Sequence, residues 1–380
     1  MTMVEILNKV CSGRDLTRDE MLCAAGRILE GATDIAQSTE FLRCLTAKGE
    51  TDEELLCMLD VMSKKAVRIQ PRLDCPVIDV CGTGGDMQQT FNISTAASFI
   101  AVAAAGGIPA GDPGGAADGA TVRGGRYGRG CAIAKHGNRS SSGVSGSADV
   151  FESIGYDNDA EPDRVCDILE AHRICFIFAQ KFHPAMRHVA AARKALGRRT
   201  AFNTLGPLAN PAGVRRQLVG VASADLLYRI SRILLKRGAR MAMVVMSNDG
   251  MDELSTSSSN MAVIADGADG GCGRMTEMVI RPEDVGLHRS EIHELRVSSV
   301  AESAAAVVGA IDGTAAAPIT ETAVLNAAGA LMVAGVADDI RYAVDVCYES
   351  VKSGSASRKL DEFAKHAGSP ALLEEIRHGP

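Results

Sequence analysis

Residues 77–105 read VIDVCGTGGDMQQTFNISTAASFIAVAAA, and this stretch decides the fold. Val77–Cys81 is a short apolar run, as in a buried strand, and glycines follow it directly. Ser94–Ala105 is apolar over the length of a helix and starts in a polar Asn/Ser/Thr cluster that can cap a helix. A buried strand, a tight turn and a helix in this order predict one unit of a mostly parallel sheet.

The same alternation continues along the chain. We expect further strands at Cys131–Ala134, Gln217–Ala222 and Met241–Met246, and a helix from about Ser147. The Ala-rich tail Ser303–Phe363 is expected to be helical. Residues 76–380 are therefore predicted to form an α/β domain, in which helices flank a mostly parallel sheet.

Residues 1–70 carry only helix signals. Thr17 with Glu20, and Thr51 with Glu54, fit the capping box, in which a hydroxyl and a carboxylate satisfy the first free amides of a helix. After the second box, apolar residues recur at helical spacing at Leu55, Leu56, Leu59 and Met62. We predict a small N-terminal helical bundle, which helices from about 163–195 rejoin.

Composition excludes several classes of protein. The chain has 380 residues, of which 46% are hydrophobic and 23% are charged, an ordinary balance for a globular protein. Forty basic and 47 acidic residues give a net charge of −7, which disfavours nucleic acid and anionic membranes as partners. No apolar run reaches the ~20 residues that span a bilayer, and the first residues lack the layout of a signal peptide. We expect a cytoplasmic protein whose 11 cysteines, none in a Cys-x-x-Cys pair, are reduced thiols.

One segment, at about residues 110–130, is too polar and glycine-rich to belong to the core. It contains 8 Gly together with Arg123, Arg126 and Arg129. Such a segment cannot bury an apolar face, so we expect a surface loop inserted in the α/β domain. A lid that contacts phosphate and a plain surface loop are both compatible with this composition.

The glycine-rich turn at Gly82-Thr-Gly-Gly-Asp86 is a candidate anion site. Bare backbone amides and the free N–H groups of the next helix would face the same space. A tight turn with a helix cap is the alternative. A P-loop would need a Lys here, and a dinucleotide fingerprint would need a third Gly where Met87 and Gln88 stand. A plain kinase or dehydrogenase is therefore disfavoured.

Three further groups of residues could bind a substrate or a metal ion. Lys135-His-Gly-Asn-Arg139, before Ser140-Ser-Ser-Gly143, combines a cation with short donors that suit a sugar phosphate. Arg193 could clamp a carboxylate with two parallel hydrogen bonds. Asp252-Glu253, after an expected strand, could hold Mg²⁺. Taken singly, these could also be a solvated loop, a surface arginine and a charged loop.

Together, these motifs resemble the anthranilate phosphoribosyltransferase family. Gly82–Asp86, Asn92–Thr95, Lys135–Arg139 and Asp252-Glu253 occur in the order typical of that family. Phe202–Leu208, Asn210-Pro211 and Leu325-Asn-Ala-Ala328 also match. The resemblance covers Val4 to Phe363 and implies a nucleoside phosphorylase/phosphoribosyltransferase-like fold with the active site between two lobes, and a homodimer.

The resemblance also implies the reaction. A member of this family transfers the phosphoribosyl group of 5-phosphoribosyl 1-pyrophosphate to the amine of anthranilate, with Mg²⁺, in tryptophan biosynthesis. The products are N-(5-phosphoribosyl)anthranilate and pyrophosphate. A nucleoside phosphorylase-like enzyme, which would not need the acidic pair, is one alternative. A non-enzymatic relative that binds nucleic acid is another, and it would require a basic groove.

Site residues follow from the resemblance position by position. Phosphoribosyl pyrophosphate is expected at Gly82, Gly85, Asp86, Thr90, Asn92, Ile93, Ser94, Thr95, Lys135, His136, Gly137, Asn138, Arg139, Ser140, Ser141, Ser142, Gly143 and Ser147. Those from Lys135 to Gly143, with Ser147, are expected in a flexible loop over the substrate. Anthranilate is expected at Gly82, Asn138 and Arg193, and Mg²⁺ at Ser94, Asp252 and Glu253. Arg193, which orients anthranilate, and His136, which could take the proton late, are the candidate catalytic residues.

Two segments depart from the family pattern. The loop at about 110–130 interrupts what is normally a short link before the Lys-His-Gly-Asn motif. Leu295–Ser299 lacks the paired glycines expected there, and we place that segment far from the chemistry. Neither departure removes an expected ligand.

Overall fold

The computed structural model describes residues 2–86, 88–107, 130–140, 143–267 and 273–379, and it divides into two compact units. The first unit comprises Met1–Arg68 and Ala179–Gly213. The second comprises Ile69–Phe178 and Val214–Pro380. The greater part of the inserted loop predicted at about 110–130 lies outside the described residues.

The first unit is helical, as its sequence predicts. Its elements are α1 (Met3–Cys11), α2 (Arg18–Leu29), α3 (Ile35–Lys48), α4 (Asp52–Lys65), α8 (Ala179–Phe182), η1 (Pro184–Met186), α9 (Arg187–Leu196), α10 (Ala201–Leu205) and η2 (Gly206–Leu208). Both predicted capping boxes, at Thr17 and Thr51, are present. Helix α3 packs against α1 and α9, and α4 packs against α2, which buries Phe41, Leu45 and Leu59.

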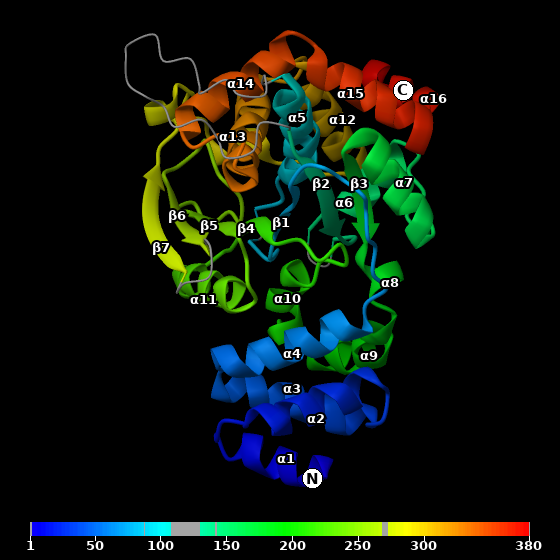
Figure 1. The fold of residues 1–380 in the computed structure, drawn as a ribbon, viewed down its shortest axis with the longest axis vertical. Helices are drawn as coiled ribbons and strands as arrows, with labels where there is room; N and C mark the ends of the chain where they lie inside the picture. The colour runs from blue at the N-terminus through cyan, green and yellow to red at the C-terminus, as the bar shows by residue number, and fades with distance from the viewer. Residues whose placement is uncertain (1, 87, 108–129, 141–142, 268–272, 380) are drawn as a thin grey trace. The chain divides into compact units, whose positions relative to one another are not determined.

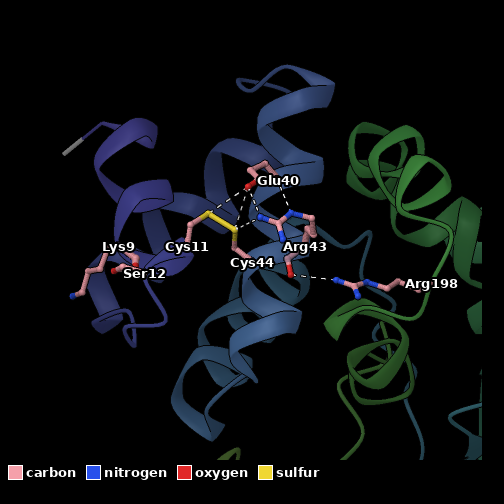
Figure 2. The surroundings of a disulfide bond; sticks show 7 residues. All are labelled: Lys9, Cys11, Ser12, Glu40, Arg43, Cys44 and Arg198. Atoms are coloured by element: carbon pink, nitrogen blue, oxygen red, sulfur yellow. Dashed lines mark hydrogen bonds and ion pairs between the residues drawn. A yellow bond between two sulfur atoms is a disulfide. The ribbon is translucent and has the colours of Figure 1, made fainter.

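A disulfide bond joins α1 to α3 (Figure 2). Its cysteines, Cys11 and Cys44, are separated by 33 positions in the sequence. Arg43 lies beside the bond, with Nη2 at 3.2 Å from the Cys44 sulfur and at 2.6 Å from Glu40. The expectation that all cysteines are reduced thiols is therefore wrong for this pair. Helix packing brings the two sulfurs together, and no local spacing signals such proximity.

A buried ion pair closes the corner between α3 and α4. Lys48 Nζ lies 2.8 Å from Glu54 Oε2, and the two side chains are only 4% and 0% exposed. Glu54 also accepts hydrogen bonds from the backbone N–H groups of Leu16 and Thr51. The capping-box glutamate Glu54 therefore also connects α4 to α3 and to the segment before α2.

The second unit contains a seven-stranded sheet (Figure 1). Its strands are β1 (Val77–Gly82), β2 (Ala132–Gly137), β3 (Ile174–Phe178), β4 (Arg216–Gly220), β5 (Met241–Ser247), β6 (Asn260–Asp266) and β7 (Arg274–Ile280). The order is β3-β2-β1-β4-β5-β6-β7. All pairs from β3 to β5 are parallel, and β6 and β7 add an antiparallel edge. The mostly parallel sheet is confirmed; β3 and the edge pair were not predicted.

Helices cover this sheet. They are α5 (Ile93–Gly107), α6 (Ser147–Ser153), α7 (Pro162–His172), α11 (Ala224–Lys236), α12 (Val300–Asp312), α13 (Ala317–Ala334), α14 (Ile340–Lys352), α15 (Ser355–Ala367) and α16 (Pro370–His378), with η3 (Glu283–Val285) and η4 (Ile292–Leu295). Within the described ranges α13 alone is long and apolar enough to cross a membrane, but most of it is buried inside this unit. It packs against α5 and against β4, as expected of a core helix.

Two boundaries differ from the predictions. We expected the helix at about 163–172 to join the N-terminal bundle, but α7 lies in the second unit, because Val165, Ile168 and Leu169 are buried where it packs on β3. The later helix α9 does belong to the first unit. We also expected a loop from Lys135, but β2 continues to Gly137, because those residues pair in parallel with β3 up to Phe178.

Candidate active site

The strand order of the sheet reverses between β1 and β4. On one side of this point the chain runs from β1 to β2 and β3, and on the other side from β4 to β5. In open parallel sheets, such a reversal leaves a crevice at the carboxyl ends of the strands, where ligands bind. Here β1 and β4 both end in glycine, with Gly82 opposite Gly220.

Asp252 lies against both glycines. A Cβ atom added at Gly82 would overlap the Asp252 carboxylate, and one added at Gly220 would overlap the Asp252 backbone carbonyl. The loop that follows β5 can lie on the strand ends only because neither strand ends in a side chain. Gly220 was not among the predicted site residues, since a glycine at the end of a strand carries no distinctive pattern.

The glycine turn after β1 is joined to the same loop. The Gly84 N–H donates to the Asp252 carboxylate, and the Thr83 N–H donates to the Gly220 carbonyl at 2.9 Å. Gly84 and Gly85 have φ angles of 69° and 84°, in the left-handed region that favours glycine. Both are exposed, so the backbone of the predicted anion cradle is open to a ligand.

The segment around Arg296 borders this turn, contrary to our expectation that it is far from the chemistry. Thr90 forms an antiparallel bridge with Arg296, and the Phe91 N–H donates to the Leu295 carbonyl at 3.0 Å. Arg296 Nη2 also donates to Gln88 Oε1 at 3.2 Å. The prediction failed because this contact joins segments about 200 positions apart in the sequence.

Helix α5 begins beside the serine-rich segment that follows β2. Asn92 Nδ2 donates to Ser145 Oγ at 2.8 Å and to Ser303 Oγ at 2.7 Å. Thr95 Oγ1 lies 3.3 Å from Ser147 Oγ. The structure therefore brings two predicted groups of phosphoribosyl ligands together at the positive end of a 15-residue helix.

Lys135 lies beneath the site rather than in a loop over it. Its side chain is buried, and Nζ donates to the Val80 carbonyl at 2.8 Å and to Ser94 Oγ at 2.9 Å. Burial lowers the pKa of Lys135, while the charges of Glu253 and Asp79 oppose that shift. A buried cation beside Ser94 and Glu253 orients the first and compensates the charge of the second.

Three carboxylates meet at this point. Burial raises the pKa of Asp252 well above its usual range, and the charges of Asp86 and Glu253 raise it further. Burial also raises the pKa of Glu253 to about 7, against the opposing effects of Lys135 and of a hydrogen bond with Ser94. Ser94 therefore contacts Glu253 of the acidic pair.

The acidic cluster fits a hard divalent cation. Carboxylates held where burial and mutual repulsion disfavour their charge form a site that a bound cation would neutralise. The oxygen donors of Asp252, Glu253 and Ser94 are of the kind that Mg²⁺ prefers, with substrate phosphates completing its shell. The residues present are therefore compatible with Mg²⁺.

The expected substrate loop starts with a short ordered turn. Asn138 Oδ1 accepts from the Arg139 N–H at 2.8 Å, and Ser140 Oγ accepts from the Gly143 N–H at 2.6 Å. The Arg139 guanidinium pairs with Asp149 and Glu152 at 2.7 and 2.5 Å. In this conformation Arg139 is therefore held by two carboxylates. Ser141 and Ser142 lie outside the described residues.

The two candidate catalytic residues belong to different units. His136 is a buried strand residue of β2, and its backbone N–H donates to Asp79 Oδ1 at 3.1 Å. Arg193 lies in α9 of the first unit, where burial lowers its pKa. The contacts described above all belong to the second unit.

Comparisons with known proteins agree with this architecture. Residues 4–66 match the helical bundle domain of a glycosyl transferase family. Residues 74–122 and 127–357 match the a/b domain of a glycosyl transferase family. Together these matches cover most of the chain.

Curated relatives share the full length of the chain. It is 46% identical over 376 residues to the anthranilate phosphoribosyltransferase of Nitrosopumilus maritimus, covering 99% of both proteins. It is 38% identical over 359 residues to that of Petrotoga mobilis, covering 94% of this chain and 95% of the relative.

Solved structures show the same fold. A crystal structure of anthranilate phosphoribosyltransferase from Thermus thermophilus superposes with a TM-score of 0.81 at 31% identity, covering 97% of this chain and 99% of that one. The Saccharomyces cerevisiae enzyme, solved in complex with PRPP and Mg, has a TM-score of 0.80 at 23% identity, with 96% and 97% covered. At that identity the likeness concerns the fold.

Proposed function

Because this chain belongs to the anthranilate phosphoribosyltransferase family, we propose that the site where β1 and β4 end binds phosphoribosyl pyrophosphate for transfer to anthranilate. The chain transfers the phosphoribosyl group to the anthranilate amine and releases pyrophosphate, a step of tryptophan biosynthesis. The contact of Ser94 with Glu253, beside the exposed glycine turn, is the observation that carries the site assignment.

In this proposal the diphosphate lies on backbone amides. The exposed backbone at Gly85 and the positive N-terminal end of α5 would favour a bound anion. Asn92 and Thr95, which are linked to Ser145 and Ser147, hold the segment after β2 near the same place. Short donors from two segments therefore surround one phosphorylated ligand.

Asp252, Glu253 and Ser94 would hold Mg²⁺ at this site. When bound, Mg²⁺ supplies positive charge beside the departing pyrophosphate. Lys135 holds the Ser94 hydroxyl in place, and Gly82 with Gly220 lets the acidic loop lie on the strand ends. These residues keep the oxygen donors in one fixed arrangement before substrate binds.

The chemical step exchanges one bond at ribose C1. The C1–O bond to pyrophosphate breaks as a C1–N bond forms, and the nitrogen then loses a proton. An aromatic amine is already neutral at pH 7, so orientation matters more than a strong base. Arg193 and Asn138 are proposed to orient anthranilate through its carboxylate and polar edge. His136 is proposed to take the proton late.

Fluorescence tests the activity directly. Anthranilate fluorescence should disappear when the protein, phosphoribosyl pyrophosphate and Mg²⁺ are mixed, and it should persist when any one of them is omitted. Replacing Asp252 and Glu253 together by Ala should abolish metal-dependent turnover. Persistent fluorescence with the unmodified protein would contradict the activity, and turnover by the double variant would contradict the metal site.

The alternatives predict different results. A nucleoside phosphorylase would cleave a nucleoside with inorganic phosphate, independently of the acidic pair. A nucleic-acid-binding relative would shift DNA or RNA in a gel. The net charge of −7 of this chain disfavours such binding. The full-length relatives support the transferase. Homodimeric assembly and a cytoplasmic location stay predictions.

A further inference from the structure

The backbone directly after Asp252-Glu253 is held by two side chains. The Leu254 N–H donates to Asn326 Oδ1 at 3.0 Å, and the Leu254 carbonyl accepts from Asn326 Nδ2 at 2.7 Å. The Ser255 N–H donates to Asn260 Oδ1 at 2.7 Å, and the Ser255 carbonyl accepts from Asn260 Nδ2 at 2.9 Å. Asn260 and Asn326, here called the asparagine clamp, are both fully buried.

Each asparagine side chain forms hydrogen bonds with the backbone N–H and carbonyl of one residue, as a neighbouring strand would. A carboxamide presents one acceptor and two donors, so it can satisfy both polar groups of a peptide backbone. A serine is too short to reach both groups, and a leucine of similar size offers no polar atom. Substitution would therefore leave buried backbone groups without hydrogen bonds and release the loop at this point.

The clamp joins the acidic loop to rigid elements. Asn326 lies in the core helix α13, and its Nδ2 also donates to the Thr322 carbonyl at 2.9 Å. Asn260 opens β6, and its Nδ2 also lies 3.2 Å from the Ile280 carbonyl at the end of β7. The loop is thereby fixed to two elements that are far apart in the sequence.

Further contacts fix the loop around the acidic pair. Asp249 accepts from the Ser255 hydroxyl at 2.6 Å and from the Met251 N–H at 3.0 Å. Asp252 itself rests on the glycine ends of β1 and β4. The clamp holds the backbone of both residues that immediately follow Glu253, so it limits how far the backbone that carries the acidic pair can move.

We propose that Asn260 and Asn326 are positioning residues for the divalent cation bound by Asp252 and Glu253. This inference rests on the proposed function. Neither asparagine is placed against substrate or cation; both act through the backbone of Leu254 and Ser255. Groups that orient metal ligands typically change metal affinity by about 10- to 100-fold when removed. A purely structural role would change stability and leave metal affinity unaltered.

The test measures cation binding as well as turnover. The variants are Asn326→Leu and Asn260→Leu in the full chain, and Leu360→Ala, which removes buried packing in α15, is the control for destabilisation. Mn²⁺ affinity is measured by electron paramagnetic resonance with and without phosphoribosyl pyrophosphate. Both asparagine variants should bind Mn²⁺ about 10- to 100-fold more weakly. Their half-saturating Mg²⁺ concentration should rise equally, with an unchanged KM for anthranilate.

Folded asparagine variants with wild-type Mn²⁺ affinity would overturn the inference, as would an equal loss in Leu360→Ala. Should the leucine variants fail to fold, Asn326→Ser and Asn260→Ser, which keep a hydroxyl, are measured in the same way. A wild-type chain that makes no phosphoribosylanthranilate refutes the proposed function. The Mn²⁺ comparison still decides the clamp, so the two failures are distinguishable.

Discussion

At Gly220 no side chain of any size fits, because the Asp252 carbonyl occupies the position of a Cβ atom. The obstacle is backbone, which cannot rotate away as the end of a long side chain can. Gly82, directly opposite in β1, faces the carboxylate of the same aspartate. The geometry of the acidic pair therefore depends on two positions that contribute no functional group.

Gly220→Ala should displace the acidic loop and lower kcat/KM by about 100-fold, the effect expected of a displacement of about 1 Å at a reacting centre. Steady-state kinetics with varied Mg²⁺ measure this. Gly26→Ala is the matched control, because nothing lies within 4 Å of a Cβ there. Wild-type activity in Gly220→Ala would contradict the described packing.

Arg193→Ala should raise the KM for anthranilate about 10- to 100-fold, because a hydrogen bond between charged groups contributes about 1.5–3 kcal/mol. The KM for phosphoribosyl pyrophosphate should change little. Lys194→Ala, an exposed neighbour on α9, is the control. An equal loss for both substrates would remove the proposed role of Arg193.

His183 makes the stability of the chain depend on pH. Burial lowers its pKa to about 4 from an ordinary 6.5, against a smaller opposing hydrogen bond with the Ala209 backbone. The unfolded chain therefore binds the proton of His183 more readily than the folded chain. The contribution of neutral His183 to the free energy of unfolding is complete above pH 6.5 and is lost as the pH falls toward 4. The total is on the order of 3 kcal/mol.

Urea unfolding at pH 7.5 and pH 5 checks this expectation. The loss of unfolding free energy between these pH values should be smaller in His183→Gln than in the unmodified chain. Equal losses in both proteins would show that His183 is not the group responsible.

The residues of the proposed site differ in how far the sequence could indicate them. Gly82–Asp86 and Asp252-Glu253 were identifiable because each is a compact motif with an evident chemical use. Asn260 and Asn326 were not, because each acts on a partner elsewhere in the chain and no spacing records that partner. The family resemblance predicts Lys135 as a substrate ligand, but it does not predict that Lys135 is buried below Ser94, because that depends on tertiary packing.

Among the elements, several strands and helices with apolar runs were predicted well, but the apolar strand β3, which reads ICFIF, was missed. Strand β1 and helix α5 agree with their predicted bounds to within two residues. The edge strand β7 was missed because it is largely exposed and reads MTEMV in its middle, without a long apolar run. The disulfide between α1 and α3 was missed because two helices must first pack before its cysteines meet.

Reduction of the Cys11–Cys44 bond should destabilise the first unit. A cross-link between positions 33 residues apart contributes about 3–4 kcal/mol by restricting the unfolded chain. Thermal unfolding with and without a phosphine reductant measures the difference. Cys23→Ser, which keeps the bond, should retain the response to reductant, whereas Cys44→Ser should lose it. An unmodified chain indifferent to reductant would contradict the contribution of this bond.

At the scale of the whole molecule, the described acidic cluster and glycine turn belong to one unit only. Phosphoribosyl pyrophosphate with Mg²⁺ should therefore slow amide hydrogen exchange at 82–95, 135–140 and 248–256, because a ligand stabilises the structure that binds it. Helices α1 and α3 should exchange as before. Mg²⁺ alone provides the comparison, and protection confined to α1 and α3 would contradict the site assignment.

The first unit is assembled from two segments that are separated by much of the second. During synthesis on the ribosome, α1–α4 emerge long before α9, against which α2 and α3 pack. In a nascent chain that ends before Ala179, the bundle is therefore incomplete, because α2 and α3 lack the helix α9 against which they pack. Translation stalls in this interval would present the apolar faces of α2 and α3 to chaperones.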